Sequence, residues 1–192
     1  KPMPDPLIAQ LPVIKELLGA FRIPVFEREG YEAEDLLATL GRRIAGPGVE
    51  VFLVTGDKDA LQLVGPRVKV YNPHHDNGLV IDEGAVEERY GVPPNRMVDL
   101  MALMGDEIDN IPGVPGIGPK TASALLKQFG TLEQLYGHLE EVPSDSQRAA
   151  LRTHRQQVEL ARELARIDAD APIEATLEGL AVREPDWQAL RR

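Results

Sequence analysis

Apolar residues recur at helical spacing twice near the start of the chain, and each stretch predicts a helix. The first is expected from about Leu7 to Gly19–Ala20, and the second from about Glu32 to Ile44. The apolar stripe of the first helix comprises Leu7, Ile8, Leu11, Ile14, Leu17, Leu18 and Phe21. Gly46-Pro47-Gly48 stops the second helix, and Val25-Phe26 is a candidate short strand between the two.

A different pattern follows and predicts strands. Residues Val49–Val54 form an almost unbroken apolar, β-branched run, which is typical of a strand buried on both faces of a parallel sheet. Val68–Tyr71 and Leu79–Ile81 flank the turn-rich residues 74–78, so we expect a hairpin there.

The remainder of the chain is expected to be mostly helical. Helices are predicted from a cap at Asp82 to Tyr90, over Met97–Met104, over Lys120–Phe129 and over Arg155–Ile167, with a weak strand at Ile173–Leu177. Capping boxes at Thr131-x-x-Gln134 and Ser144-x-x-Gln147 indicate two further helix starts. After Gly105 the chain becomes rich in glycine and proline and then in short predicted helices. We therefore predict an α/β region over residues 1–104 and an α-rich region over residues 105–192.

Composition narrows the classes of protein that fit. The 192 residues are 43% hydrophobic and 27% charged, which is typical of a globular chain, and no apolar run is long enough for a membrane span. The absence of cysteine excludes disulfides, thiolate metal sites and a cysteine nucleophile. A net charge of −10 disfavours a generic basic nucleic-acid coat, but it is compatible with carboxylates that hold metal ions.

Acidic residues gather at three places. They are Glu32, Glu34 and Asp35 at a helix start, Asp57 and Asp59 just after a buried strand, and Asp106 and Asp109 in a loop. Each group also has an ordinary interpretation, namely a complement to the helix dipole, an Asx turn and solvated turn residues. If the groups meet, seven carboxylates require cations, and oxygen-only ligation favours two Mg²⁺ or Mn²⁺ ions. Lys58 would then lie near a phosphate, or it is simply an exposed lysine.

The stretch from Ile111 to Thr121 is rich in glycine and proline and precedes an apolar helical stripe. Glycines let backbone N–H groups approach a ligand, and Lys120 lies beside the expected helix start, so the loop predicts a phosphate site. Its pattern is typical of a helix-hairpin-helix element that grips duplex DNA without reading bases. A stiff interhelical loop is the alternative, and the spacing excludes a Walker P-loop.

Three motifs together carry a family resemblance. YEAEDLLATL, LVTGDKDALQL and LMGDEIDNIPGVPGIGPKTASALL resemble, in order and spacing, the 5′ nuclease (5′-3′ exonuclease) domain of bacterial DNA polymerase I, in the flap endonuclease superfamily. The similarity runs from about Pro2 to Pro172. It implies a PIN-like α/β fold with a parallel-sheet core, followed by a helix–three-turn–helix region. It also implies cleavage of 5′ flaps and removal of RNA primers with two divalent ions.

The resemblance assigns roles to residues of this chain. Asp57, Asp59 and Lys58 resemble catalytic residues. The metal-site acids would be Glu32, Glu34, Asp35, Asp57, Asp59, Asp106 and Asp109. The contacts to duplex phosphates would be Gly116, Ile117, Gly118, Lys120 and Thr121. Glu34 stands where polymerase I relatives usually have aspartate. The loop over residues 111–121 in relatives often holds a K⁺ through carbonyls. The implied partners are duplex DNA with a 5′ flap or RNA primer and a polymerase domain in the parent chain. The resemblance also implies a monomeric bacterial protein that is cytoplasmic, associated with the nucleoid and without membrane contact.

The chain also departs from the family pattern. The amino-terminal strand with its metal-binding Asp and the second Asp before a flexible arch have no counterpart, and Lys1-Pro2-Met3-Pro4 resembles the segment after that arch. We therefore expect a fragment downstream of the arch that lacks two metal ligands, unless an upstream segment supplies them. The alternative function is a catalytically incomplete fragment that only binds duplex or branched DNA. A phosphohydrolase with Asp57 as nucleophile is a third reading, but it leaves the glycine loop without a role.

Overall fold

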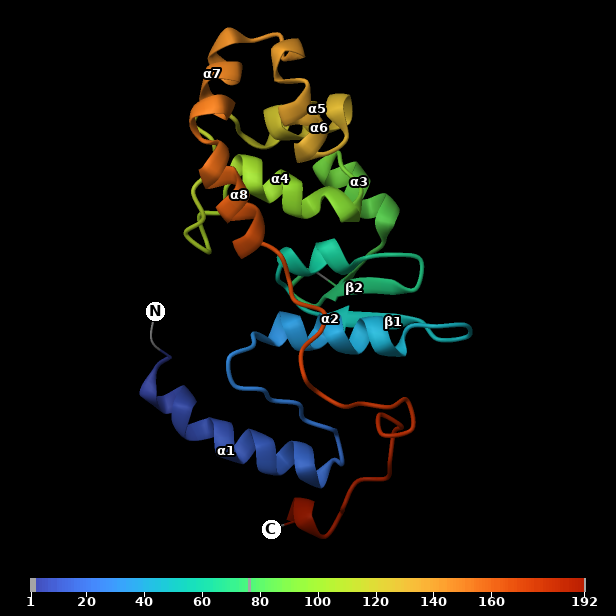
Figure 1. The fold of residues 1–192 in the computed structure, drawn as a ribbon. Coiled ribbons are helices and arrows are strands. Elements are labelled where there is room, and N and C mark those ends of the chain that lie inside the picture. The colour runs from blue at the N-terminus through green and yellow to red at the C-terminus, as the bar shows by residue number, and fades with distance from the viewer. Residues whose placement is uncertain (1–2, 76, 192) are drawn as a thin grey trace. The chain divides into compact units, whose positions relative to one another are not determined.

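The computed structural model describes residues 3–75 and 77–191, and two compact units are distinguished within the chain (Figure 1). The first unit joins residues 1–44 to residues 169–192, and the second comprises residues 45–168. Parts of two predictions, at Lys1-Pro2 and at Asp76, lie outside the described residues.

The first unit is organised around α2 (Ala33–Ile44), and α1 (Asp5–Ala20) precedes it. Leu36 of α2 packs with Ala171 and Ile173 in a small buried cluster. Buried Thr39 ties the same segment to the helix, because its Oγ1 accepts a hydrogen bond of 3.0 Å from the backbone N–H of Ala171. Arg43 also donates to the carbonyl of Ile173. The segment around residues 171–173 therefore packs against α2, although about 130 positions separate the two in the sequence.

Helix α1 is formed as predicted, but none of its residues, all of which are described, is buried. Its apolar stripe is partly exposed, with Leu7 at 42%, Ile14 at 42% and Leu17 at 48% of their surface. The helix is joined to the end of the chain, where the backbone N–H of Asp186 donates to the carbonyl of Ala20 at 2.8 Å.

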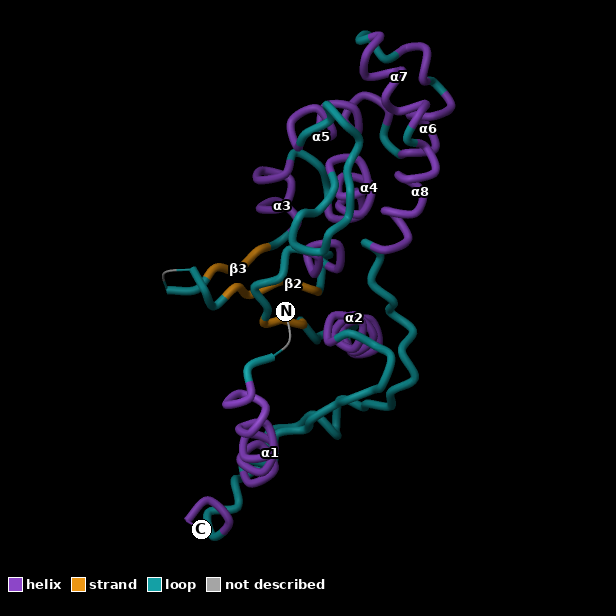
Figure 2. The backbone as a smooth tube through the Cα atoms, turned by 90° about the vertical axis from the view of Figure 1, so that its left-hand side faces the viewer, coloured by secondary structure: helices purple, strands orange, loops and turns teal. Residues whose placement is uncertain are grey.

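The second unit contains a small mixed sheet with the order β1-β2-β3, seen as the strand segments of Figure 2. Strands β1 (Val51–Val54) and β2 (Val68–Asn72) are parallel, with Val51 opposite Val68. Strand β3 (Leu79–Ile81) returns antiparallel to β2 and completes the predicted hairpin. Burial of β1 on both faces was predicted wrongly, because only Leu53 is buried and the side chains of Phe52 and Val54 are 47% and 61% exposed.

Helices form the rest of the second unit. Their bounds are Glu83–Tyr90 for α3, Met97–Met104 for α4, Pro119–Phe129 for α5, Leu132–Gly137 for α6, Asp145–Thr153 for α7 and Arg155–Leu164 for α8. Helix α4 is the central element, with Met97, Leu100 and Leu103 at most 1% exposed, and it packs against α5 and α8. In the described chain, no helix is both long and apolar enough to cross a membrane.

Local signals in the sequence are confirmed at several helix ends. The side chains of Asp82, Thr131 and Ser144 each accept a hydrogen bond from the backbone N–H three residues on, and Gly91 ends α3 with φ of 72°. The helix predicted over Arg155–Ile167 ends three residues earlier, at Leu164.

Two predicted strands are wrong. Residues 25–26 and 173–177 lie in loops and turns, although both segments contain β-forming side chains. Phe26 and Ile173 instead meet in the small cluster on α2, so their apolar character is used for packing rather than for a sheet ladder.

Candidate metal centre and phosphate loop

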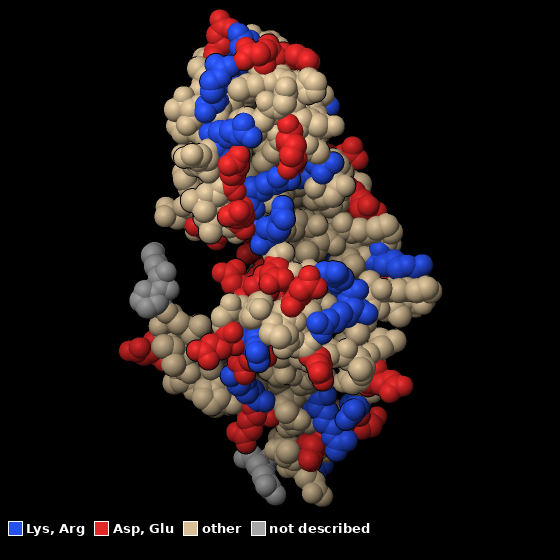
Figure 3. Space-filling view, viewed as in Figure 1, with Lys and Arg blue, Asp and Glu red and all other residues tan. Residues whose placement is uncertain are grey.

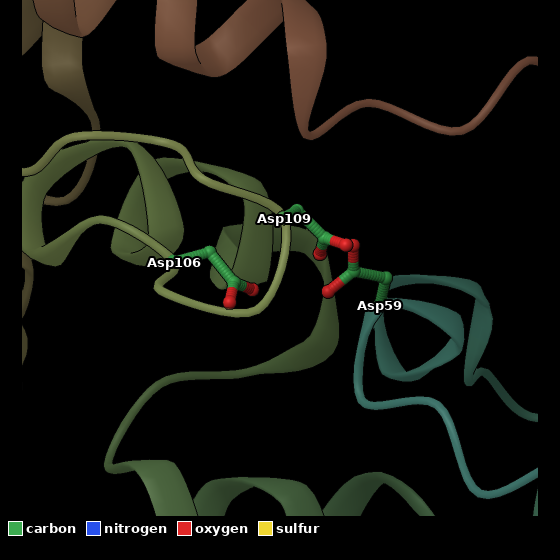
Figure 4. A group of neighbouring side chains, drawn as sticks. All are labelled: Asp59, Asp106 and Asp109. Atoms are coloured by element: carbon green, nitrogen blue, oxygen red, sulfur yellow. The ribbon is translucent and has the colours of Figure 1, made fainter. Parts of the chain in front are cut away.

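Three aspartates of the second unit form the acidic cluster that we call the three-acid cluster. Asp59, Asp106 and Asp109 each offer a carboxylate oxygen, and these oxygens lie within 4.8 Å of one another. Asp59 comes from the start of the 3₁₀ helix η1 (Asp59–Leu63), and the other two come from the loop after α4 (Figure 4). Asp59 thus shares one small volume with two residues that lie 47 and 50 positions further along the chain.

The turn after β1 positions the first of these side chains. The backbone N–H of Asp57 donates to Oγ1 of Thr55 at 3.1 Å, and the N–H of Asp59 donates to Oδ1 of Asp57 at 2.9 Å. This is the Asx turn that the sequence also allowed, and it directs Asp59 into the cluster while Asp57 stays exposed. The ordinary role of Asp57 thus supports the placement of Asp59.

The loop after α4 is held closed by its own backbone. Asp106 and Ile111 exchange two backbone hydrogen bonds of 2.8 Å, and Oδ1 of Asp106 accepts a third of 3.0 Å from the N–H of Ile108. The loop also needs glycine at its base, because Gly105 has φ of 77° and a Cβ there would lie 2.3 Å from the backbone nitrogen of Gly113. The Asp106 carboxylate is therefore held by a rigid frame.

Charge in the cluster is balanced in part by Lys58. Its ammonium forms an ion pair with Oδ2 of Asp106 and lies 4.0 Å from Oδ1 of Asp59. Burial acts to raise the pKa of Asp106, but the contact with Lys58 and the hydrogen bond from the Ile108 N–H outweigh it and lower this pKa. Burial and then the neighbouring Asp57 raise the pKa of Asp59 to about 6. Lys58 thus stabilises the charged form of Asp106 more than that of Asp59.

The donor set fits a hard divalent cation. Oδ1 of Asp59 and Oδ2 of Asp106 are both buried and, apart from their ion pairs with Lys58, have no hydrogen-bond partner among the described residues. The Asp106 side chain is only 3% exposed, so water cannot readily compensate its charge. Carboxylate oxygens without nitrogen or sulfur donors favour Mg²⁺ or Mn²⁺.

The remaining predicted metal ligands, Glu32, Glu34 and Asp35, lie at the start of α2 in the first unit. Oδ2 of Asp35 accepts a hydrogen bond of 3.0 Å from the backbone N–H of Glu32, which is the reciprocal half of a capping box. Their ordinary role at the helix start is therefore present. Their role as metal ligands stays a prediction.

The glycine-rich loop leads into α5 as expected. Gly118 is the N-cap residue and offers no side-chain cap, and Lys120 in the first turn is exposed. A Cβ at Gly116 or Gly118 would meet no described atom within 4 Å. Gly116 has φ of 80°, which explains its glycine, but Gly118 has an ordinary φ of −88°. Neither packing nor backbone geometry within the described chain requires glycine at position 118.

Two other predicted contacts in this loop differ in character. Thr121 is half-buried, and the Ile117 side chain is only 3% exposed, so a contact from Ile117 to a phosphate would come from its backbone. Gln157 of α8, which the sequence reasoning missed, donates from Nε2 to the carbonyls of Gly113 at 2.9 Å and Pro112 at 3.2 Å. A glutamine on a helix 44 positions away carries no local signal of this role.

On the face shown in Figure 3, basic side chains over α7 and α8 lie among acidic ones, and several of them form ion pairs. Arg148 pairs with Asp145, and Arg155 pairs with Glu159 at 3.0 Å. Arg162 pairs with buried Asp99 at 2.8 Å. The glycine loop and Lys120 therefore remain the stronger candidates for a phosphate contact.

The structure thus combines a candidate divalent-metal centre, formed by the three-acid cluster, with a glycine-rich loop that opens a helix. Comparison with known families identifies the class of protein to which this combination belongs. Residues 1–91 match the family model described as the 5′-3′ exonuclease, N-terminal resolvase-like domain. Residues 92–188 match the model described as the 5′-3′ exonuclease, C-terminal SAM fold. The chain belongs to the 5′-3′ exonuclease family.

Individual relatives agree with this assignment. The chain is 44% identical over 187 residues to DNA polymerase I of Bacillus caldotenax, covering 95% of this chain and 21% of that protein. It is 39% identical over 189 residues to the 5′-3′ exonuclease of Aquifex aeolicus, covering 98% of this chain and 63% of that protein. The chain thus spans about a fifth of the first relative and less than two thirds of the second.

Solved structures share the fold. A bacteriophage T5 flap endonuclease in a pseudo-enzyme-product complex with DNA and metal ions superposes with a TM-score of 0.68 at 22% identity. That match covers 84% of this chain and 58% of the T5 chain. The catalytic core of Rad2 in complex with DNA substrate gives a TM-score of 0.60 at 21% identity, over 99% of this chain and 64% of that one.

Proposed function

We propose that this chain carries the metal site and the DNA-binding loop of a structure-specific 5′ nuclease that hydrolyses phosphodiester bonds of 5′ flaps and RNA primers. The observation that carries the proposal is the three-acid cluster, in which two buried carboxylate oxygens have only Lys58 as a partner among the described residues. Membership of the 5′-3′ exonuclease family supports the same reaction class.

In this proposal, Asp59, Asp106 and Asp109 hold divalent ions, and Asp57 orients Asp59 through the Asx turn and adds a further carboxylate. Two Mg²⁺ or Mn²⁺ ions held by such acids would lower the pKa of an attacking water and stabilise the leaving oxygen. Lys58 supplies a cation close to the same carboxylates and can contact the scissile phosphate. Glu32, Glu34 and Asp35 are proposed to complete the acid set from the first unit.

The glycine loop is proposed to hold the duplex beside the cut. Gly118 is the most informative residue, because an approaching phosphate explains a glycine that internal packing and φ do not. The uncapped start of α5 and exposed Lys120 favour an anion at this place. Gly116, Ile117 and Thr121 would contribute through the shape and backbone of the loop, and a K⁺ in residues 111–121 remains part of the proposal.

The finer architecture and partners belong to the same proposal. We infer a PIN-like core and a helix–three-turn–helix region divided near Gly105, and a polymerase domain in a longer parent protein, as the names of the polymerase relatives suggest. Complexes of the T5 and Rad2 proteins with DNA support a branched or duplex DNA partner for this chain. A monomeric state and a nucleoid-associated location are expected with it.

Cleavage of a labelled 5′-flap duplex tests the proposal, with Mg²⁺ or Mn²⁺ and with EDTA as the metal-free control. Asp106→Asn is expected to abolish metal-dependent cleavage, because it removes a buried ligand charge, while flap binding persists. Glu107→Gln is the matched control, since Glu107 is an exposed acid of the same loop outside the cluster. Binding without cleavage in every metal supports the alternative, a DNA-binding fragment. Cleavage by Asp106→Asn at the wild-type rate contradicts the metal assignment.

A further inference from the structure

Lys58 occupies an unusual position for a lysine between two acids in a turn. Its side chain is 26% exposed, and its ammonium lies between Asp106 and Asp59, both of which are less exposed than it is. The lysine therefore places a positive charge against two carboxylates that water reaches less easily than it reaches the ammonium itself.

The two oxygens nearest this ammonium are the same two that identify the candidate metal site. Oδ2 of Asp106 is paired with Lys58, and Oδ1 of Asp59 lies 4.0 Å from its Nζ. Both oxygens are buried and, among the described residues, have no hydrogen-bond partner apart from these ion pairs. A divalent ion coordinated by these oxygens would occupy the space of the ammonium, and two cations in contact repel strongly where water is scarce.

We propose that Lys58 is the resident counter-cation of the three-acid cluster and that it must leave Asp106 when a divalent ion binds. This inference rests on the proposed metal site and adds a coupling to it. In the metal-free protein the ammonium offsets repulsion among the carboxylates, so the fold tolerates the empty cluster. Ion binding displaces the ammonium from Asp106 and makes it available to an anion beside the cluster, such as a DNA phosphate.

The coupling predicts that removing the ammonium tightens metal binding without DNA. Lys58→Met keeps the length of the side chain and removes its charge. Its affinity for Mn²⁺, measured from the electron paramagnetic resonance signal of free Mn²⁺, should rise about tenfold, the equivalent of one charged hydrogen bond. Lys69→Met is the matched control, because Lys69 is 29% exposed, lies in the same unit and pairs with Glu50 at 3.0 Å outside the cluster. That control should change the affinity less than about twofold, since screening weakens distant charges.

A second readout uses the wild-type chain and does not depend on how a variant folds. The side-chain ammonium signal of Lys58, assigned by comparison with Lys58→Gln, should be observable in EDTA because the ion pair slows proton exchange. Saturating Mg²⁺ should abolish that signal or shift it strongly.

Each outcome decides the matter. Equal Mn²⁺ affinity of wild type and Lys58→Met, or an unchanged Lys58 signal in saturating Mg²⁺, overturns the coupling and leaves the proposed metal site intact. Absence of Mn²⁺ binding by both wild type and Lys58→Met overturns the coupling together with that site.

Discussion

The Asp99–Arg162 ion pair offers a direct test of how the helices of the second unit are held together. Nε of Arg162 on α8 lies 2.8 Å from Oδ1 of Asp99 on α4, and the Asp99 side chain is only 3% exposed. The backbone N–H of Leu132 donates to the other carboxylate oxygen at 3.3 Å. Arg162 also pairs with Glu133 of α6, so one guanidinium links three helices.

The substitution Arg162→Met keeps much of the apolar stem and leaves the Asp99 carboxylate buried with one remaining donor. Breaking a buried pair in this way costs about 3–5 kcal/mol, and because Arg162 is 27% exposed we expect the lower end, about 3 kcal/mol. For a chain of this size, that corresponds to a fall in Tm of about 6–12 °C. Burial already raises the pKa of Asp99 and Arg162 opposes the rise, so the variant carboxyl will protonate more readily. The loss should therefore be smaller at about pH 5 than at about pH 8.

Thermal unfolding in EDTA, followed by circular dichroism of the helices, measures this effect at both pH values. Arg152→Met is the control, since Arg152 and Glu140 form an exposed pair, with 60% and 78% of their side chains accessible, and such pairs contribute about 0–1 kcal/mol. Asp99→Asn in the Arg162→Met background should recover part of the loss. If Arg162→Met lowers Tm no more than Arg152→Met, the buried pair does not hold these helices together.

Three further predictions concern the cluster, the first unit and the loop. The folded pKa of Asp59, about 6, lies above its unfolded value, so its ionisation opposes folding of the metal-free protein as the pH rises from about 4 to beyond 6. In EDTA at about pH 7.5, Asp59→Asn should therefore raise the free energy of unfolding by about 1–2 kcal/mol, allowing for partial solvent screening, and at about pH 4 it should give no gain. Equal gains at both pH values would contradict the link between the ionisation of Asp59 and stability. Thr39→Val leaves the backbone N–H of Ala171 without its acceptor and should cost about 1–3 kcal/mol, read from the unfolding midpoint of Trp187 fluorescence; an unchanged midpoint would show that this tie contributes little. Lys120→Ala should weaken binding to all duplex sequences about equally and reduce the log–log salt slope by about one; a sequence-dependent loss would contradict a phosphate contact.

Features with a local physical cause could be predicted from the sequence. The cap at Asp82 and the stop at Gly91 depend on residues within one helical turn, and both are confirmed. The hairpin of β2 and β3 follows from two β-forming runs around a turn-rich segment. The strands predicted at Val25-Phe26 and Ile173–Leu177 are wrong. Of these residues Phe26 and Ile173 pack in the cluster on α2, and the contact between Ile173 and α2 joins distant parts of the chain, which a local pattern does not reveal.

The candidate site likewise combines features that the sequence predicts with contacts that only the fold creates. The sequence predicted that seven acids would come together if their three segments met, and the structure brings three of them, Asp59, Asp106 and Asp109, within reach of one another. It could not predict that Lys58 pairs with Asp106, since that contact depends on how two loops meet in space. The contact from Gln157 to Gly113 is likewise invisible to local patterns.

The most direct test of the account is the position of a bound metal ion. Crystals of the chain soaked in Mn²⁺ should show an anomalous-scattering peak within about 2.5 Å of carboxylate oxygens of Asp59, Asp106 and Asp109. Such a peak is the result that we predict. A cluster without Mn²⁺ at saturating concentration, or a peak held by other residues, would contradict the claim that these aspartates form the metal centre.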